Sequence, residues 1–265
     1  MVRHMGTDRQ LSGLRARLAQ PQTRLLAAFV GIPRIEVVQI VGYAGYDLVI
    51  LDGEHGVFDP SSLAGLVAAG KVAGLDVVVR VPQLSAPAIS AALDAGADGV
   101  LVPHVRDADE AAAAVAACRF PPQGARSVHG AVPAARYGLR PDYLAAANTD
   151  AACIVMCEDA AALATIEQTA AVPGLDAVFV GSYDLSASMG HVGEPGHERV
   201  VAASVEVLAA TGRAGVAMGV MAPHPGVVRD WFERGARFVV AGVDTVMLRE
   251  GAQATLAATG ARPSR

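Results

Sequence analysis

Eight short apolar segments alternate with eight Ala-rich segments along the chain, and this repetition constrains the fold more than any other feature. The apolar segments are rich in Val, Ile and Leu on both faces, as expected for parallel strands covered by helices. These strands are predicted over residues 25–32, 47–52, 76–81, 99–105, 153–157, 177–180, 217–221 and 238–241. The helices that follow them are predicted over 33–45, 61–74, 86–96, 108–118, 160–171, 198–210, 226–235 and 245–258.

Eight strand–helix units predict an α/β fold in which the strands close into a (β/α)8 TIM barrel. The 265 residues fit one such domain, so residues 1–265 are expected to form a single barrel domain. A doubly wound open sheet is the alternative, but its Gly-x-Gly-x-x-Gly fingerprint does not follow the first predicted strand.

Two stretches depart from the repeat. Residues 119–150 form an insert between the fourth helix and the fifth strand; its Pro and Gly residues lead to a short helical piece at 143–148. A long insert in a compact domain is usually functional or covers something. Residues 1–8 are expected to be flexible, and residues 9–19 to form a short helix that caps the bottom of the barrel.

Charge and composition exclude several classes of partner. The net charge of −5 makes nucleic-acid binding an unfavourable interpretation. No apolar run of 18 charge-free residues is present, so no membrane span is expected. The three cysteines are too few for a disulfide framework, which favours a cytoplasmic location.

The basic residues are 20 Arg and a single Lys, Lys71. Schiff-base chemistry would need this residue. Lys71 is predicted in the last turn of the second helix, and helix carboxyl termini lie at the end of a barrel opposite the active face. We therefore expect no Schiff-base lysine and no organic cofactor anchored on one.

Ionisable residues follow several predicted strands, where catalytic groups of barrel enzymes lie. Glu158 and Asp184 form a carboxylate pair that suits a hard divalent ion, although both could be unrelated helix caps. His55 is the natural acid–base candidate, and Arg80 lies within an apolar strand where a charge is costly. Supporting positions are expected for His104 and His224, and surface positions for His4, His191 and His197.

Several segments, in order over residues 24–258, resemble the HpcH/HpaI aldolase family. The combination of Gly-Glu-His, the strand-three Arg and the GxxDLSxxMG stretch is specific to it. The segments are LVILDGEHGVFD (48–59), VVVRVP (77–82), ALDAGADGVLVPHV (92–105), RFPPQGARSV (119–128), VFVGSYDLSASMG (178–190) and FVVAGVDTVML (238–248).

The resemblance implies a (β/α)8 barrel and a class II aldolase. Such an enzyme uses Mg²⁺, Mn²⁺ or Co²⁺ to cleave or form a 4-hydroxy-2-oxoacid, giving pyruvate and an aldehyde. It further implies a homo-oligomer, a trimer or hexamer, in which the last helix is often exchanged between subunits. Pyruvate, its 2-oxoacid precursor and an aldehyde would be the small-molecule partners.

The resemblance also implies residue roles. Glu158 and Asp184 would hold the metal, and Arg80 would stabilise the enolate oxygen of pyruvate. His55 would be the general base, oriented by Asp52 or by Asp94, the latter from a neighbouring subunit. The substrate carboxylate would be bound by backbone groups in the stretch formed by Gly181, Ser182, Tyr183 and Asp184.

Two departures from the family pattern stand out. Met156 replaces a frequent Gln and Ser182 a frequent Pro, and the first of these removes a polar partner of the substrate or metal. Alternative functions are an oxaloacetate decarboxylase or an acyl-CoA/citrate-type lyase using the same site, and a non-catalytic barrel subunit.

Overall fold

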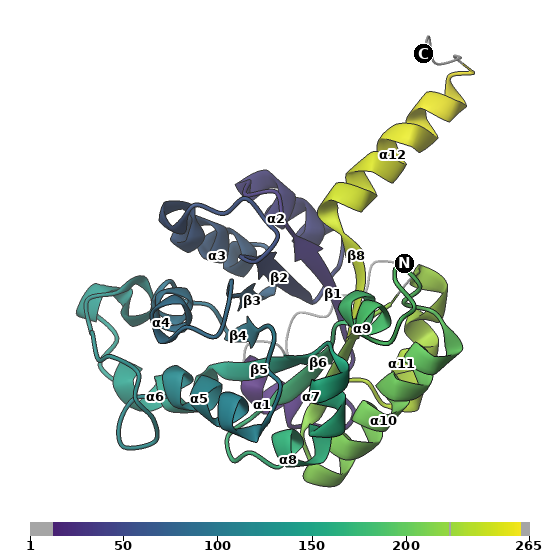
Figure 1. Ribbon diagram of the computed structural model, residues 1–265. Coiled ribbons are helices and arrows are strands. Elements are labelled where there is room, and N and C mark those ends of the chain that lie inside the picture. The colour runs from purple at the N-terminus through teal and green to yellow at the C-terminus, as the bar shows by residue number, and fades with distance from the viewer. Residues whose placement is uncertain (1–12, 223, 261–265) are drawn as a thin grey trace.

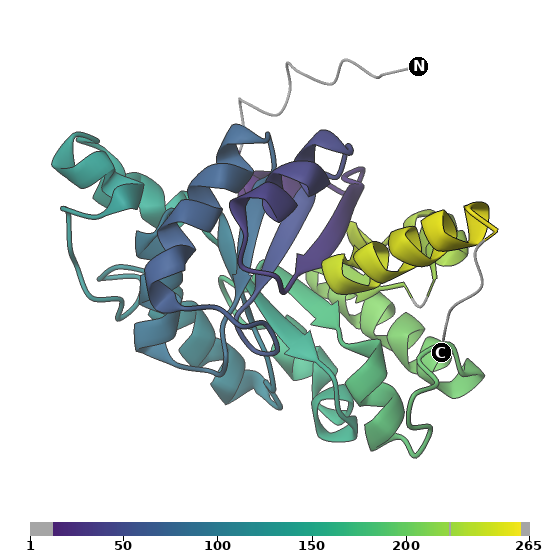
Figure 2. The same ribbon diagram turned by 90° about the horizontal axis from the view of Figure 1, so that it is seen from above.

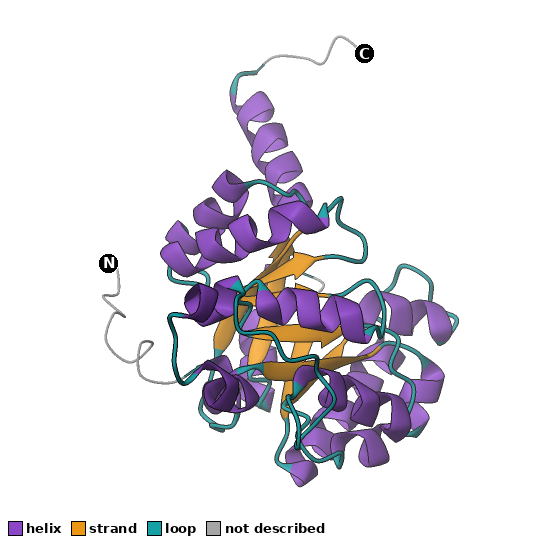
Figure 3. Ribbon diagram, turned by 90° about the vertical axis from the view of Figure 1, so that its left-hand side faces the viewer, coloured by secondary structure: helices purple, strands orange, loops and turns teal. Residues whose placement is uncertain are grey.

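A computed structural model describes residues 13–222 and 224–260 of the chain. Its eight strands form one closed parallel barrel in sequence order, each hydrogen-bonded to the next and β8 to β1. This confirms the predicted (β/α)8 barrel and excludes the open sheet. Figure 3 shows the strands enclosed by helices. The strands are β1 (Leu25–Val30), β2 (Leu48–Asp52), β3 (Asp76–Arg80), β4 (Gly99–Val102), β5 (Ala152–Cys157), β6 (Ala177–Val180), β7 (Ala217–Met221) and β8 (Phe238–Val243).

Helices cover the outside of the barrel, as the labels of Figure 1 show. They are α1 (Leu14–Leu18), α2 (Ile35–Tyr43), α3 (Leu63–Val72), α4 (Ala86–Asp94), α5 (Ala108–Cys118), α6 (Tyr143–Asp150), α7 (Ala160–Ala164), α8 (Ile166–Ala170), α9 (Ser182–Ser188), α10 (Glu198–Ala214), α11 (Val228–Arg234) and α12 (Asp244–Ala258). Short 3-10 turns lie at Pro60–Ser62, Pro133–Gly138 and Pro225–Val227.

The alternation of strand side chains places the site. Leu48 and Ile50 of β2 point into the barrel, so Asp52 continues the same inward row at the carboxyl end of the strand. In β3 the inward row runs from Val78 to Arg80. The alternation of side chains along each strand is therefore enough to direct these two charged side chains into the barrel at its carboxyl end.

Aromatic side chains fill the barrel interior below this level. Phe179 stacks on Phe238 with ring centroids 5.7 Å apart and meets Phe29 edge-on at 6.0 Å. A Cβ at Gly219 would lie 2.0 Å from the ring of Phe238, so only glycine leaves room for that ring. The centre of the barrel is thus a packed core, and an open pocket can form only at its end.

The amino-terminal end of the barrel is closed by α1. Leu14 and Leu18 are buried in the same cluster as the inward strand residues. The short capping helix expected within residues 9–19 is therefore present at 14–18, while residues 1–12, including the segment 1–8 expected to be flexible, lie outside the described residues.

The insert of residues 119–150 packs beneath the barrel. Phe120, Val132 and Tyr143 form a small apolar cluster with their neighbours, and the insert contacts α4 and α1. Because α5 ends and β5 begins at the amino-terminal end of the barrel, the insert lies away from the carboxyl ends of the strands. It therefore does not cover the predicted active face.

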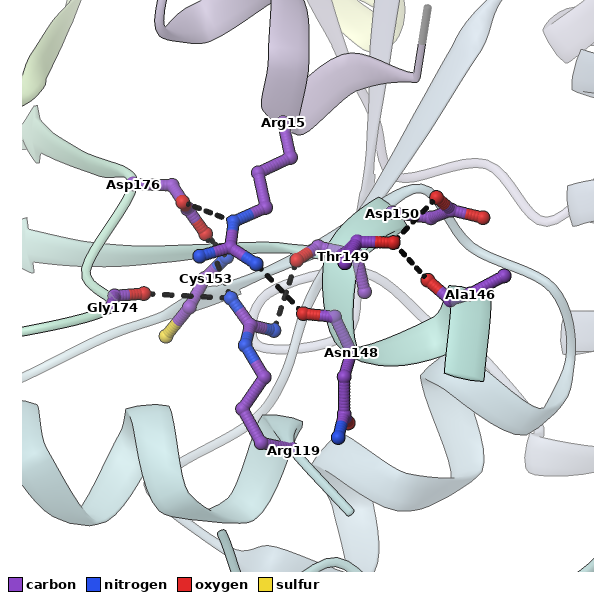
Figure 4. A network of polar contacts seen from close by, with 10 residues as sticks. Arg15, Arg119, Ala146, Asn148, Thr149, Asp150, Cys153, Gly174 and Asp176 are labelled. Atoms are coloured by element: carbon purple, nitrogen blue, oxygen red, sulfur yellow. Dashed lines mark hydrogen bonds and ion pairs between the residues drawn. The ribbon is translucent and has the colours of Figure 1, made fainter. Parts of the chain in front are cut away.

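A buried polar network joins this insert to the barrel (Figure 4). Asp176 accepts hydrogen bonds from Arg15 Nε at 2.7 Å, Arg119 Nη2 at 3.0 Å and the Cys153 N–H at 2.8 Å. Arg119 also donates to the Ala151 carbonyl at 2.9 Å. The network thus fastens α1, the insert and the start of β5 to the segment before β6.

Several strand and helix ends lie a few residues from their predicted positions, and three differences are informative. Strand β4 ends at Val102 because Pro103 follows and His104 has a φ of 57°, which extended pairing cannot accommodate. The helix expected over 160–171 is divided at Thr165 into α7 and α8. Helix α9 is not predicted from the sequence, because its seven residues are too few to show a helical period.

Lys71 lies in the last turn of α3, as predicted. Its ammonium group pairs with Asp98 just before β4, at the amino-terminal end of the barrel. The single lysine of the sequence is therefore held in an ion pair at the opposite end from the residues Asp52 and Arg80.

The last helix, α12, projects away from the barrel (Figures 1 and 2). Asp244 at its start is buried and accepts hydrogen bonds from the N–H groups of Gly31 and Ile32, which follow β1. Almost every residue beyond Asp244 is exposed to solvent. Within residues 13–222 and 224–260, no helix combines the length and apolar character needed to cross a bilayer.

Candidate active site

A cavity of about 420 Å³ opens at the carboxyl end of the barrel. Its polar lining comes from the ends of β2 and β3 and from the segment after β6, and its apolar lining from β1, β5, β6, β7, β8 and the start of α12. The structure thus brings together seven of the residues singled out from the sequence, which are Asp52, His55, Arg80, Gly181, Ser182, Tyr183 and Asp184.

Arg80 and Asp52 form a buried bidentate pair at the base of this cavity. Arg80 donates from Nε to Oδ1 of Asp52 at 2.9 Å and from Nη2 to Oδ2 at 2.7 Å. Strand register brings them together, since Asp52 of β2 pairs with Arg80 of β3. Burial is the largest influence on the pKa of Asp52 and opposes its ionisation. The hydrogen bonds from Arg80 and from the N–H groups of Glu54 and His55 outweigh burial and lower the pKa.

Glu54 holds the other side of the same guanidinium. Its Oε2 lies 2.9 Å from Nη1 of Arg80, and the guanidinium carbon stands 4.8 Å from the ring centroid of Phe29. The guanidinium makes two hydrogen bonds, both to Asp52, and an ion pair with Glu54, so it keeps further N–H groups that a ligand could use. Arg80 is a fixed cation at the base of the cavity.

His55 is placed by its backbone. Its N–H donates to Oδ1 of Asp52 at 3.1 Å, while its side chain is exposed at the rim of the cavity. A Cβ at Gly53 would lie 2.5 Å from the carbonyl oxygen of Arg80, so the turn that leads to His55 needs glycine there. Asp52 therefore positions the turn that carries His55, rather than contacting its imidazole.

Glu158 follows β5 and is buried beside the cavity. One oxygen, Oε1, accepts the His104 N–H at 2.6 Å, whereas Oε2 is buried with no hydrogen-bond partner among the described residues. Burial raises the pKa of Glu158, and the neighbouring carboxylates of Asp184 and Glu54 raise it further against the opposing effect of His104. A buried carboxylate with a free oxygen and two acidic neighbours is suited to a divalent cation.

His104 lies beside the acidic residues of the site, in keeping with the supporting position expected from the sequence, which did not indicate its particular contacts. Its Nε2 lies 2.8 Å from Oε1 of Glu54, and its Nδ1 lies 3.0 Å from Oε1 of Glu158. The left-handed backbone of His104 turns both its N–H and its ring toward Glu158. The Pro-His sequence after β4 was the only available signal, and it does not specify a positive φ.

The segment after β6 lines the opposite side of the cavity. Gly181 packs against Glu158 so closely that a Cβ there would lie 2.9 Å from the Glu158 Cβ. Helix α9 starts at Ser182, and Tyr183 and Asp184 are exposed in its first turn. The backbone N–H groups of a first helical turn have no partners within the helix and are available to an anion.

Asp94 does not reach this cavity within the chain. It is the last residue of α4, at the amino-terminal end of the barrel, where it pairs with Arg126 of the insert. His224 lies outside the set of residues that line the cavity. Asp244 is the first residue of α12, and its carboxylate accepts hydrogen bonds from the N–H groups of Gly31, after β1, and of Thr245.

Apolar residues form the remaining wall. Met156 points inward from β5 and lines the cavity together with Phe29, Phe179 and Met221. The two cysteines of the same strand, Cys153 and Cys157, are buried, and burial raises the pKa of the Cys157 thiol to about 12. The thiols of β5 are therefore unsuited to act as nucleophiles or metal ligands.

A family model described as HpcH/HpaI aldolase/citrate lyase matches residues 26–251. Among curated proteins, the chain is 41% identical over 220 residues to a 4-hydroxy-2-oxovalerate aldolase of Rhodococcus jostii, covering 83% of this chain and 85% of that protein. It is 37% identical over 248 residues to a hydroxypyruvate/pyruvate aldolase of Paraburkholderia phytofirmans, covering 91% and 95%.

A solved structure with the same architecture is that of an HpcH/HpaI aldolase/citrate lyase family protein from Burkholderia cenocepacia. It superimposes with a TM-score of 0.89 at 36% identity, covering 94% of this chain and 99% of that one. The similarity therefore extends over the whole barrel and not only over isolated motifs.

Proposed function

The chain belongs to the HpcH/HpaI aldolase/citrate lyase family, and from this premise we propose that it is a metal-dependent aldolase. Its reaction is the cleavage of a 4-hydroxy-2-oxoacid to pyruvate and an aldehyde, or the reverse condensation. The observation that carries the proposal is a continuous charged network at the carboxyl end of the barrel. It runs from the fixed cation Arg80 through Glu54 and His104 to Glu158, whose buried Oε2 has no hydrogen-bond partner among the described residues.

Glu158 and Asp184 are the residues proposed to hold a divalent ion such as Mg²⁺, Mn²⁺ or Co²⁺. The free Oε2 of Glu158 and the exposed carboxylate of Asp184 supply oxygen ligands of the kind these ions prefer. When bound, the ion supplies positive charge that stabilises the oxygen of a pyruvate enolate. His104 and Gly181 position Glu158 for this role.

Arg80 provides the second positive charge. Its N–H groups that make no hydrogen bond within the described residues are proposed to bind a substrate oxygen, while Asp52 and Glu54 hold the guanidinium in place. A donor fixed in place before the reaction stabilises a developing oxyanion without reorganisation. The N–H groups of Ser182, Tyr183 and Asp184 are proposed to bind the substrate carboxylate.

His55 is the proposed general base. It accepts the proton of the C4 hydroxyl, the C3–C4 bond breaks, and the electron pair passes into the enolate of pyruvate while the aldehyde leaves. His55 lies at the rim of the cavity, so its imidazole can reach a group that extends beyond the pyruvate unit. Asp94 is proposed to contribute only from another copy of the chain, since it lies at the far end of its own barrel.

A screen for pyruvate release tests this assignment. The full-length protein is incubated with a series of 4-hydroxy-2-oxoacids, with added Mn²⁺ or Mg²⁺ and with EDTA. Pyruvate release that requires the metal is expected with at least one substrate. Pyruvate release that persists in EDTA would overturn the metal-dependent mechanism, and absence of both pyruvate release and metal binding would favour a non-catalytic barrel.

Replacement of His55 separates aldol cleavage from decarboxylation at the same site. Decarboxylation of oxaloacetate yields the same enolate but needs no base at C4. We expect His55→Asn to lower kcat/KM for aldol cleavage by about 10²- to 10⁴-fold, the usual contribution of general base catalysis. Oxaloacetate decarboxylation should be largely retained, and an equal loss of both activities would contradict the role given to His55.

We also propose that the protein is a homo-oligomer in which α12 packs on another copy. The helix projects from its own barrel, and an apolar groove of about 240 Å³ beside its start is lined by Ile32, Val37, Ile40, Val41, Asp244, Met247 and Leu248. A helix with so little of its surface buried gains most of its stability from packing on another surface.

A further inference from the structure

Two histidines and a glutamate gather on the connection between α9 and α10. His191 follows α9 by three residues, and His197 is the residue that precedes α10. Glu194 lies midway, giving the spacing His-x-x-Glu-x-x-His. A ligand atom of each of the three residues lies within 4.8 Å of one of each of the others. The sequence alone suggested only surface positions for the two histidines.

The backbone of this connection is held in a compact form. The His191 N–H donates to the carbonyl of Ser186 at 2.7 Å, and the Glu194 N–H donates to the carbonyl of His191 at 3.0 Å. The His197 N–H donates in turn to the carbonyl of Glu194 at 2.9 Å. These bonds link the three residues in series, so their side chains are brought to one place by a fixed turn.

The imidazoles stand in close contact. The rings of His191 and His197 are stacked with centroids 3.5 Å apart and planes inclined by 17°. The stacking brings a ring nitrogen of each histidine close to one of the other and to a carboxylate oxygen of Glu194.

One ring nitrogen has no partner in the protein. Nε2 of His191 is buried and makes no hydrogen bond within the described part of the chain. Nδ1 of His197 accepts the Arg199 N–H at 3.2 Å, in an exposed position where water can replace it. A buried acceptor without a donor is costly, and a cation facing it would remove that cost.

We propose that His191, Glu194 and His197 bind a transition-metal ion of the Zn²⁺ class. Two imidazole nitrogens and one carboxylate oxygen are a ligand set suited to Zn²⁺, with water in a remaining position. Because the lone pair of an imidazole nitrogen lies in the plane of its ring, the two rings must turn out of their stacked arrangement for both nitrogens to bind one ion. The inference does not depend on the proposed function, because none of the three residues lines the aldolase cavity.

The proposed ion would stabilise the segment that leads from the active face to α10. Helix α9 carries Asp184 in its first turn and is followed directly by the connection that contains the three ligands. Binding an ion that the unfolded chain does not hold would raise the melting temperature. The ion is therefore expected to act on stability, not on the chemistry.

Titration of Zn²⁺ in excess Mg²⁺ tests the proposal with the full-length protein. Mg²⁺ occupies oxygen sites such as Glu158 and Asp184 but competes poorly for imidazole. We expect binding of one Zn²⁺ per chain, measured by equilibrium dialysis and metal analysis, together with a higher Tm. Co²⁺ used as a probe should give visible absorption bands whose intensity saturates at the same stoichiometry.

Variants of the ligands show whether the ion lies at this connection. Glu194→Gln keeps the size of an exposed side chain, and His191→Asn leaves the cap of α10 in place. Loss of a residue that only supports a metal ligand weakens metal binding roughly 10- to 100-fold. Each of these variants loses a ligand itself and should weaken Zn²⁺ binding by at least that factor. The matched control is His129→Asn, which changes an exposed histidine of the insert and should leave binding unchanged.

Any one of three results would overturn the proposal. The first is that the wild-type protein binds no Zn²⁺ when Mg²⁺ is in excess. The others are that both ligand variants bind Zn²⁺ as tightly as the wild type, or that the control variant loses as much affinity as they do. Circular dichroism of the variants without Zn²⁺ confirms that they are folded. Should His191→Asn fail that check, Glu194→Gln alone decides the outcome.

Discussion

Arg80 illustrates how one charged residue is kept inside a barrel. Only 7% of its surface is exposed, and isolated burial of a guanidinium would be prohibitively costly. Two carboxylates, Asp52 and Glu54, offset that cost and leave the group pointing at the cavity. The local net charge of these three residues is negative, so binding of an anionic substrate depends on further positive charge nearby.

Arg80→Lys should therefore impair catalysis although it keeps the charge. An ammonium cannot make the parallel bonds to both oxygens of Asp52 while also reaching Glu54. We expect kcat/KM to fall by about 10²- to 10³-fold, as when one preorganised oxyanion donor is lost. Steady-state assays of pyruvate release measure the change. A variant with near wild-type kcat/KM would show that position 80 needs only a charge.

Glu158 should make the metal-free protein less stable as the pH rises. Its pKa is raised by burial, so the folded protein holds this proton more tightly than the unfolded chain does. This contribution to stability is therefore fully present below the ordinary pKa of glutamate. It is lost as the pH rises through the raised pKa of Glu158 in the folded protein. Glu158→Gln removes this dependence, because its amide does not titrate.

The measurement is the Tm of both proteins in EDTA from acid to neutral pH. As the pH rises, the Tm of Glu158→Gln should increase relative to that of the wild type. Added Mg²⁺ should raise the Tm of the wild type but not that of the variant. The lowered pKa of Asp52 has the opposite effect on stability but is common to both proteins. A difference that does not vary with pH would contradict this account.

The polar residues of the cavity could be predicted because strand period and the barrel rule identify strand ends. Asp52, Arg80 and Asp184 all follow from that reasoning and line one cavity. The role of His104 could not be predicted in the same way, since it depends on a positive φ after Pro103. Nor does sequence spacing show that Glu54 and His104 come within 2.8 Å of each other.

At the scale of elements, the strands could be predicted because each is a short, mostly apolar run that lies between Ala-rich helical segments. Helix α9 is different, because its seven residues have too few apolar positions to show a helical period. The division between α7 and α8 likewise depends on tertiary contacts: Thr165 Oγ1 donates to the Arg106 carbonyl at 2.6 Å. Packing against neighbours decides such elements.

The network around Asp176 fastens the insert to the barrel, and Asp176→Ala should be strongly destabilising. The substitution leaves Arg119 buried without its counter-charge and Arg15 without its ion pair. Loss of one partner from a buried ion pair costs about 3–5 kcal/mol in unfolding free energy. Urea unfolding followed by circular dichroism measures the change.

The exposed pair in the same insert provides the control. Asp150 is paired with Arg140 at 3.1 Å, and 52% of its side chain is exposed. We expect Asp150→Ala to change the unfolding free energy by less than about 1 kcal/mol. Equal effects of the two substitutions would show that burial of the Asp176 network does not decide its contribution.

For the whole molecule, closure of the barrel explains the arrangement of its two ends. Aromatic side chains fill the interior, α1 seals the amino-terminal end and the insert lies beneath it. At the carboxyl end, charged groups from the ends of several strands converge on one cavity. The eight repeated units made this architecture predictable. The direction of α12 could not be predicted, because it depends on what the helix packs against.

The projection of α12 leads to a prediction about assembly. Leu248 on this helix is 65% exposed and Ile40 on α2 is 66% exposed, although both line the apolar groove at the junction of the two helices. Exposed apolar surface of this kind marks an interaction site, and the proposed occupant is α12 of a second copy. A glutamate in place of either residue would introduce a charge into that contact.

Leu248→Glu and Ile40→Glu should each lower the mass of the protein in solution, measured by size-exclusion chromatography with light scattering. The matched control is Leu139→Glu, which places the same charge on an exposed leucine of the insert and should leave the mass unchanged. A wild-type monomer, or assembly that survives both substitutions, would contradict the proposed exchange. Because Asp244 ties the start of α12 to the segment after β1, the dissociated chain should retain its barrel, and circular dichroism should show an otherwise folded protein.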